Sequence, residues 1–170
     1  MKQPLPRCIR PGVTGFGHGS FPPPILVDFK AFRALCYTAV RATDATILSF
    51  DPMPFNTVRN FVFALFQLSQ APGAPSVFLL LNQHVPLLGC AFAHDQTSPQ
   101  QNGSPFPFTD VPTLTTIFES SYVILKKEEL ELPWTWSESE LASRLPPEEI
   151  KQIVHWKPQT VGEVLFNFWD

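Results

Sequence analysis

The apolar residues near the start of the chain follow a helical period. In the segment that follows Asp28, apolar residues recur at positions i, i+3, i+4 and i+7, namely Phe32, Leu35, Cys36 and Ala39. This spacing places them on one face of a helix of about three turns. An aspartate side chain accepts hydrogen bonds from the first free N–H groups of a helix, so Asp28 is the predicted N-cap.

Several short apolar runs predict β-strands. Residues 25–29, 46–50 and 121–126 each form an apolar run of a length that is typical of a strand. Residues 77–81 and 87–93 form two further runs, which a short polar link joins. Because strands with a short connection pair antiparallel, this segment is predicted to be a β-hairpin.

Residues 57–70 are apolar almost throughout and predict a second helix. Asn56 can cap this helix, and its apolar residues would surround it on nearly all sides, which indicates a buried element. Each of the two predicted helices follows a predicted strand. Two consecutive strand–helix units can bring their strands into a parallel pair, so we expect a mixed sheet.

The last third of the chain carries the start signals of helices. Residues 137–140 and 160–163 have the spacing of capping boxes, and residues 146–149 place proline and acid in a first helical turn. We therefore predict three short helices within 137–169, and another short helix capped by Asp110. The last helix is predicted to seal the domain and not to be a free docking peptide, because so short a helix is not stable alone.

These elements together predict a single α+β domain with a mixed β-sheet of about five strands, packed helices and a helical C-terminal cap. Residues 1–24 are rich in glycine and proline and predict an irregular arm in front of a domain at 25–170. Residues 94–108 are polar and spaced by prolines, so we expect a mobile loop there. The cap corresponds to the helices of 137–169.

Composition narrows the classes of function. Of the 170 residues, 44% are hydrophobic and 13% aromatic, which argues against a disordered chain, and the net charge of -3 disfavours nucleic acid as a partner. The apolar runs are interrupted before they reach the length of a membrane span, and the first residues lack the apolar stretch of a secretory signal. Three widely spaced cysteines fit no disulfide framework, so we expect a cytoplasmic protein.

Cys90 is the one candidate nucleophile that the sequence offers. A thiolate beside an imidazole is the arrangement of cysteine hydrolases, and His84 and His94 flank Cys90 in the chain. However, Cys90 lies in the apolar run 87–93, where burial would raise the pKa of its thiol and leave it inert. The histidines and cysteines show no metal-ligand spacing, so we expect neither a metal nor another cofactor.

Five aromatic residues are candidate binding residues. Phe106 and Phe108 lie in the predicted loop, Trp134 and Trp136 lie two apart in a proline-flanked linker, and Trp169 is almost the last residue. Aromatic side chains are enriched at the centre of protein interfaces, so these five are predicted to contact a partner protein. The alternative is that they pack onto the core of their own domain.

The end of the last predicted helix carries an unfavourable charge. Asp170 adds its side chain and the terminal carboxylate at the negative end of the helix, where cations are preferred. A basic residue from elsewhere could neutralise it, and the sequence leaves the choice open among Arg7, Arg10, Arg41, Arg59, Lys126 and Lys127.

The function that the sequence predicts is that of a small intracellular protein-binding or assembly protein without catalytic activity. Its expected partner is another protein, with no nucleic acid and no membrane, and its oligomeric state is left open. The alternative is a cysteine-dependent or metal-assisted hydrolase that uses Cys90 with His84 or His94.

Overall fold

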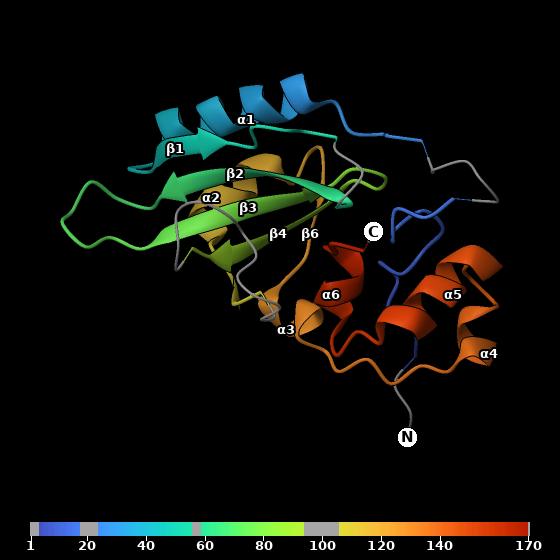
Figure 1. Ribbon diagram of the computed structural model, residues 1–170. Helices are drawn as coiled ribbons and strands as arrows, with labels where there is room; N and C mark the ends of the chain where they lie inside the picture. Colours follow the sequence, from blue (N-terminus) through green and yellow to red (C-terminus); the bar gives the residue numbers. More distant parts are fainter. Residues whose placement is uncertain (1–3, 18–23, 56–58, 94–105, 170) are drawn as a thin grey trace.

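A computed structural model of the chain describes residues 4–17, 24–55, 59–93 and 106–169. Within these ranges, helices lie on both faces of a six-stranded sheet (Figure 1). The strands are β1 (Thr46–Phe50), β2 (Phe61–Gln67), β3 (Ser76–Asn82), β4 (Leu87–Phe92), β5 (Phe108–Thr109) and β6 (Val123–Ile124). The helices are α1 (Phe29–Ala42), α2 (Pro112–Thr115), α3 (Lys127–Leu130), α4 (Glu138–Leu141), α5 (Pro147–Trp156) and α6 (Val161–Leu165).

The sheet is mixed, as predicted, but its parallel pair differs from the expected one. The strands follow the order β1-β2-β3-β4-β5 with antiparallel neighbours, and β6 lies parallel to β4. Residues 25–29 form no strand; instead, the N–H groups of Leu26 and Val27 both donate to the carbonyl of Gln83. The predicted parallel pair is therefore wrong, because its first strand does not exist and β1 pairs antiparallel with β2.

The predicted helix at 57–70 is also wrong, since this segment contains the strand β2. β2 lies between β1 and β3, and its residues from Phe61 to Phe66 are all buried. A strand that is covered on both faces is apolar at every position, and a buried helix has the same composition. The apolar run therefore indicated burial and could not by itself separate the two structures.

Each face of the sheet builds its own apolar core. Alternate residues of β2 point to opposite faces, so Phe61, Phe63 and Leu65 belong to one cluster and Val62, Ala64 and Phe66 to the other. The first cluster lies under the C-terminal helices and residues 4–17, and the second lies under α1 and α2. Besides these strand residues, the second cluster contains Phe32, Cys36, Ala39, Leu114 and Phe118.

The C-terminal helices agree with the capping signals. Ser137 N–H donates to the Glu140 carboxylate at 2.8 Å, and Thr160 Oγ1 accepts from Glu163 N–H at 3.3 Å. The last helix, however, ends at Leu165, so Trp169 lies beyond it. The sequence predicted that Asp170 ends this helix, but the helix ends five residues earlier. Asp170 itself lies outside the described residues.

Two segments differ from the predicted loops and caps. Residues 4–17 form successive turns, and Ile9 and Val13 are fully buried in the first core cluster. The carboxylate of Asp110 does not cap α2; it accepts a hydrogen bond from Lys127 N–H at 2.8 Å.

Among the described residues, no helix has the length and hydrophobicity needed to cross a membrane.

Candidate functional site

Asn82 is the centre of a buried polar network at the end of β3. Its Nδ2 donates to the carbonyl oxygens of Val13, at 2.9 Å, and Leu165, at 2.7 Å. Its Oδ1 accepts from the N–H groups of His84, at 2.9 Å, and Val85, at 3.2 Å. One fully buried amide therefore satisfies four backbone groups, two of them in its own turn and two in distant segments of the chain.

Asn60 and Asn167 extend the network to the C-terminal segment. Asn60 Nδ2 donates to the carbonyl of Val13 at 2.7 Å, and its Oδ1 accepts from Asn167 N–H at 2.8 Å. Asn167 Nδ2 donates to the carbonyl of Thr14 at 3.0 Å, and its Oδ1 accepts from Trp169 N–H at 3.3 Å. Both asparagines are buried, so their hydrogen bonds fix the segment around Trp169 against the N-terminal turns.

Glu149 joins α5 to the same N-terminal turns. Its carboxylate is fully buried and accepts hydrogen bonds from Gly12 N–H at 2.7 Å, Thr14 N–H at 3.0 Å and Thr14 Oγ1 at 2.5 Å. A buried carboxylate needs such donors, and its place in the first turn of α5 adds the favourable end of the helix dipole. Gly12 has a φ of 88°, a value at which a side chain would be strained.

Three aromatic rings, Phe16, Trp169 and Trp156, lie next to one another, and we call them the aromatic row. The rings of Trp156 and Trp169 are parallel within 3°, with centroids 6.4 Å apart, and Phe16 lies 6.4 Å from Trp169. Trp156 is 38% exposed, and the other two rings are partly exposed. The row therefore presents an aromatic surface to solvent.

The polar network fixes the backbone at two of the three residues of the aromatic row, Phe16 and Trp169. Phe16 N–H donates to Thr14 Oγ1 at 3.3 Å, and Thr14 is itself bound by Glu149. Trp169 N–H is held by Asn167, as described above. Rings that are already ordered lose little conformational entropy when a partner binds, so the arrangement suits binding.

The structure places the five predicted binding residues in different environments. Phe108 is 2% exposed, Phe106 is also buried, and their rings lie 5.5 Å apart in the first core cluster. Trp136 is buried, and Trp134 packs edge-on against it at 5.2 Å and is partly exposed. Phe106, Phe108 and Trp136 are thus core side chains that offer little surface to a partner. Trp169 alone joins the aromatic row.

Sequence reasoning missed Phe16, Trp156 and the three asparagines. The asparagines stand in apolar surroundings in the sequence, and that contrast was the available signal of a buried polar network. Asn60 lies in the segment 57–70, for which the sequence predicted a buried helix. The pairing of Trp156 with Trp169 depends on contacts between α5 and the end of the chain, which spacing does not reveal.

The hydrolase alternative depends on Cys90, which is 2% exposed among apolar residues of the second core cluster. Burial, and secondarily the charge of Asp110, raises the pKa of the Cys90 thiol to about 12. A cavity of about 530 Å³ lies beside Cys90, Asp110 and Lys126, and the described residues that line it include no histidine. The thiol is therefore protonated at neutral pH, and no described residue that lines this cavity supplies the imidazole that the hydrolase alternative requires.

Of the two histidines in the hydrolase alternative, His84 lies in a turn away from this cavity, and His94 lies outside the described residues. His84 is in the turn between β3 and β4, with Nδ1 3.2 Å from the carbonyl of Pro24, while Cys90 pairs with Leu79 further along the hairpin. His94, like most of the predicted loop 94–108, lies outside the described residues. Within the described part of the chain, no three histidine, cysteine or carboxylate side chains come together as metal ligands.

Native protein is expected to leave Cys90 unlabelled by a maleimide reagent at pH 8, and to label it after denaturation. The thiolate is the reacting form, and a thiol with a pKa of about 12 is almost wholly protonated there. Mass spectrometry of the peptide that contains Cys90 measures the result. Rapid labelling of the native protein at pH 8 would contradict the buried, inert thiol.

Comparisons of the chain with protein-family models, curated proteins and solved structures gave no match.

Proposed function

We propose that this protein is a small binding protein without catalytic activity, and that it contacts another protein through the aromatic row. The observation that carries the proposal is the exposure of Trp156 in a row whose other two residues are fixed by a buried polar network. Tryptophan is among the residues that contribute most to binding energy at protein interfaces. A rigid tryptophan surface supplies that energy at a low entropic cost.

A protein partner fits this surface better than a nucleic acid does. Bases could stack on tryptophan rings, but strands of nucleic acid also require a positively charged groove for their phosphates. The chain has 12 basic against 15 acidic residues, so it is acidic overall. We therefore propose a polypeptide as the ligand of the aromatic row.

We also propose that the protein works in the cytoplasm. All three cysteines, Cys8, Cys36 and Cys90, lie in the described part of the chain as free thiols. A chain whose thiols are all reduced fits a reducing compartment. This proposal is separate from the choice of partner.

Replacing Trp156 with serine is expected to abolish capture of the partner while it changes the free energy of unfolding by about 1 kcal/mol or less. The ring is partly exposed, so its loss removes surface for binding but little core packing. The measurement is quantitative mass spectrometry of proteins that co-purify from a lysate of the source organism, together with urea unfolding.

Val154→Ser is the matched control, because Val154 lies on the same helix and is 42% exposed. This variant is expected to capture the same proteins in the same amounts as the unaltered chain. Equal capture by Trp156→Ser and the unaltered chain would exclude the aromatic row as the docking surface.

A further inference from the structure

A second surface lies where α1 meets the edge strand β1. α1 covers the face of the sheet opposite to the C-terminal helices. α1 contains Lys30, Arg33 and Arg41 and no acidic residue, although the chain as a whole has a net charge of -3. These three side chains are exposed, and the positions 30, 33, 37 and 41 fall on one face of the helix. Exposed aspartates flank the helix at Asp28 and Asp44, so the positive charge belongs to this one face of α1 on a protein that is acidic overall.

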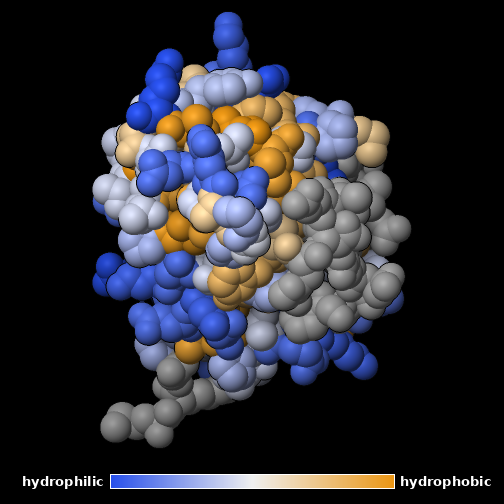
Figure 2. Space-filling model, turned by 90° about the vertical axis from the view of Figure 1, so that its left-hand side faces the viewer, coloured by the Kyte–Doolittle hydropathy of each residue, from blue (hydrophilic) through white to orange (hydrophobic). Residues whose placement is uncertain are grey.

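Aromatic contacts place this face of α1 beside β1. The guanidinium of Arg33 lies 4.6 Å from the centroid of the Phe50 ring, and the Tyr37 ring lies 5.7 Å from it. Tyr37 is 48% exposed, and Leu48 on β1 is also exposed. Figure 2 shows hydrophilic side chains at the top of the molecule, where α1 lies in Figure 1, above an exposed hydrophobic area.

β1 is the first strand of the sheet and, among the described residues, pairs only with β2. Its outer edge therefore carries backbone groups that another extended chain can bind. A β-bulge between Ile47 and Ser49 interrupts the regular register. Such a bulge hinders the pairing of β1 with the sheet edges of other molecules in aggregates. It still allows a short strand to pair with β1 if the side chains of that strand fit.

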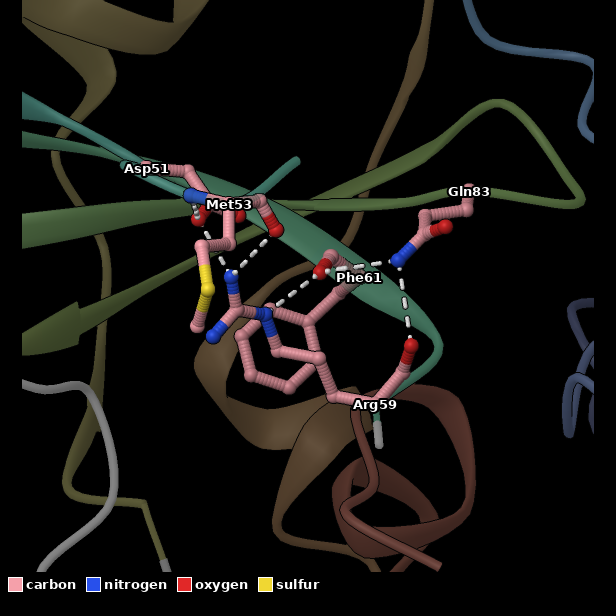
Figure 3. Close-up of polar contacts among 5 residues, drawn as sticks. All are labelled: Asp51, Met53, Arg59, Phe61 and Gln83. Atoms are coloured by element: carbon pink, nitrogen blue, oxygen red, sulfur yellow. Dashed lines mark hydrogen bonds and ion pairs between the residues drawn. The ribbon is translucent and has the colours of Figure 1, made fainter. Parts of the chain in front are cut away.

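A buried ion pair holds the end of β1 against β2. Arg59, just before β2, pairs with the buried carboxylate of Asp51, just after β1, and donates to the carbonyl of Met53 at 3.3 Å (Figure 3). Asp51 N–H also donates to the carbonyl of Phe63 on β2 at 3.0 Å. The edge of β1 is thus fixed before any partner arrives, which lowers the cost of binding.

We propose that β1 binds an acidic, extended segment of a partner protein as an added strand. Its backbone would pair with the free edge of β1, its acidic side chains would pair with Arg33 and Arg41, and its apolar ones would cover Leu48. Strand addition of this kind obtains affinity from the main chain and selectivity from side chains. This surface does not include the aromatic row, so the proposal holds or fails independently of it.

The test uses a fluorescent peptide, Glu-Val-Glu-Val-Glu-Val-Glu, and measures its binding by fluorescence anisotropy. The peptide is expected to bind at least about tenfold more tightly than its lysine counterpart, and more weakly in about 0.5 M salt, because the charges attract. Replacing the central valine with proline is expected to abolish binding, since proline cannot continue the ladder. The backbone N–H resonances of residues 46–50 should shift with the acidic peptide.

Charge reversal at α1 distinguishes binding of the peptide at this surface from unspecific electrostatic attraction to the protein. Arg33→Glu with Arg41→Glu is expected to lose the acidic peptide, whereas the control Lys126→Glu with Lys151→Glu, also at exposed lysines, should retain it. Equal loss in both double variants, or equal binding of the proline peptide, would overturn strand addition in favour of unspecific attraction. Binding to phosphatidylserine vesicles but not to the acidic peptide would overturn it in favour of a membrane surface.

Discussion

Replacing Asn82 with alanine is expected to lower the free energy of unfolding by about 4 kcal/mol or more. The change removes four hydrogen bonds: the N–H groups of His84 and Val85 lose this acceptor, whereas the carbonyls of Val13 and Leu165 keep a hydrogen bond from Asn60 Nδ2. Each buried polar group that loses its partner costs about 1–3 kcal/mol. Urea unfolding, followed by tryptophan fluorescence, measures the loss.

Two further variants show whether the hydrogen bonds of Asn82 are the cause. Gln159→Ala removes an exposed amide that donates once, to the carbonyl of Lys157, and is expected to change stability by less than about 1 kcal/mol. Asn82→Asp keeps the volume of the side chain but directs a carboxylate oxygen at the carbonyls of Val13 and Leu165. It should destabilise strongly at pH 7; a stability equal to that of the unaltered protein would contradict the network.

Replacing Gly162 with alanine is expected to destabilise the protein by about 3 kcal/mol, although alanine is the better helix former. A Cβ atom at this position in α6 would lie 2.2 Å from Cε2 of Phe108 and 3.0 Å from the carbonyl oxygen of Leu130. The ring of Phe108 is buried and the Leu130 oxygen belongs to the backbone, so neither can move aside freely. Thermal and urea unfolding provide the measurement.

A double variant tests the steric cause directly. Phe108→Leu removes the clashing end of the ring, so Gly162→Ala should cost at least about 1 kcal/mol less in its presence than in the unaltered protein. Additive effects of the two substitutions would contradict the contact between Phe108 and α6. The same series tests whether Phe108 belongs to the core, as its burial indicates, or to a contact loop.

Local signals in the sequence were sufficient for the elements whose caps and periods are distinctive. Asp28 caps α1 as predicted, with its Oδ1 accepting from the N–H groups of Lys30 and Ala31, and the strand at 46–50 and the hairpin are present. β2 was mistaken for a helix because burial on both faces removes the alternation that distinguishes a strand. The period of the apolar residues cannot distinguish a strand from a helix where every position is buried.

The candidate site depends on contacts that no local pattern encodes. Glu149 binds Gly12 across 137 positions of the chain, and Asn167 binds Thr14 across 153. Phe106 and Phe108 have the proline-flanked setting of a contact loop, yet their rings fill the space between the sheet and the C-terminal segment, where Phe106 stacks on Phe168. Aromatic residues in such a setting suit either role, and only the packing of the sheet decides between them.

The most direct test of the aromatic row as a docking surface is hydroxyl-radical footprinting of the free protein and of its complex from the source lysate. Trp156 is expected to lose most of its reactivity in the complex, because a partner that covers the row excludes the radical from a ring that is otherwise partly exposed. Phe92, which is 39% exposed at the end of β4 and belongs to neither proposed surface, is the internal reference and should react equally in both samples. Full reactivity of Trp156 in the complex would contradict the account.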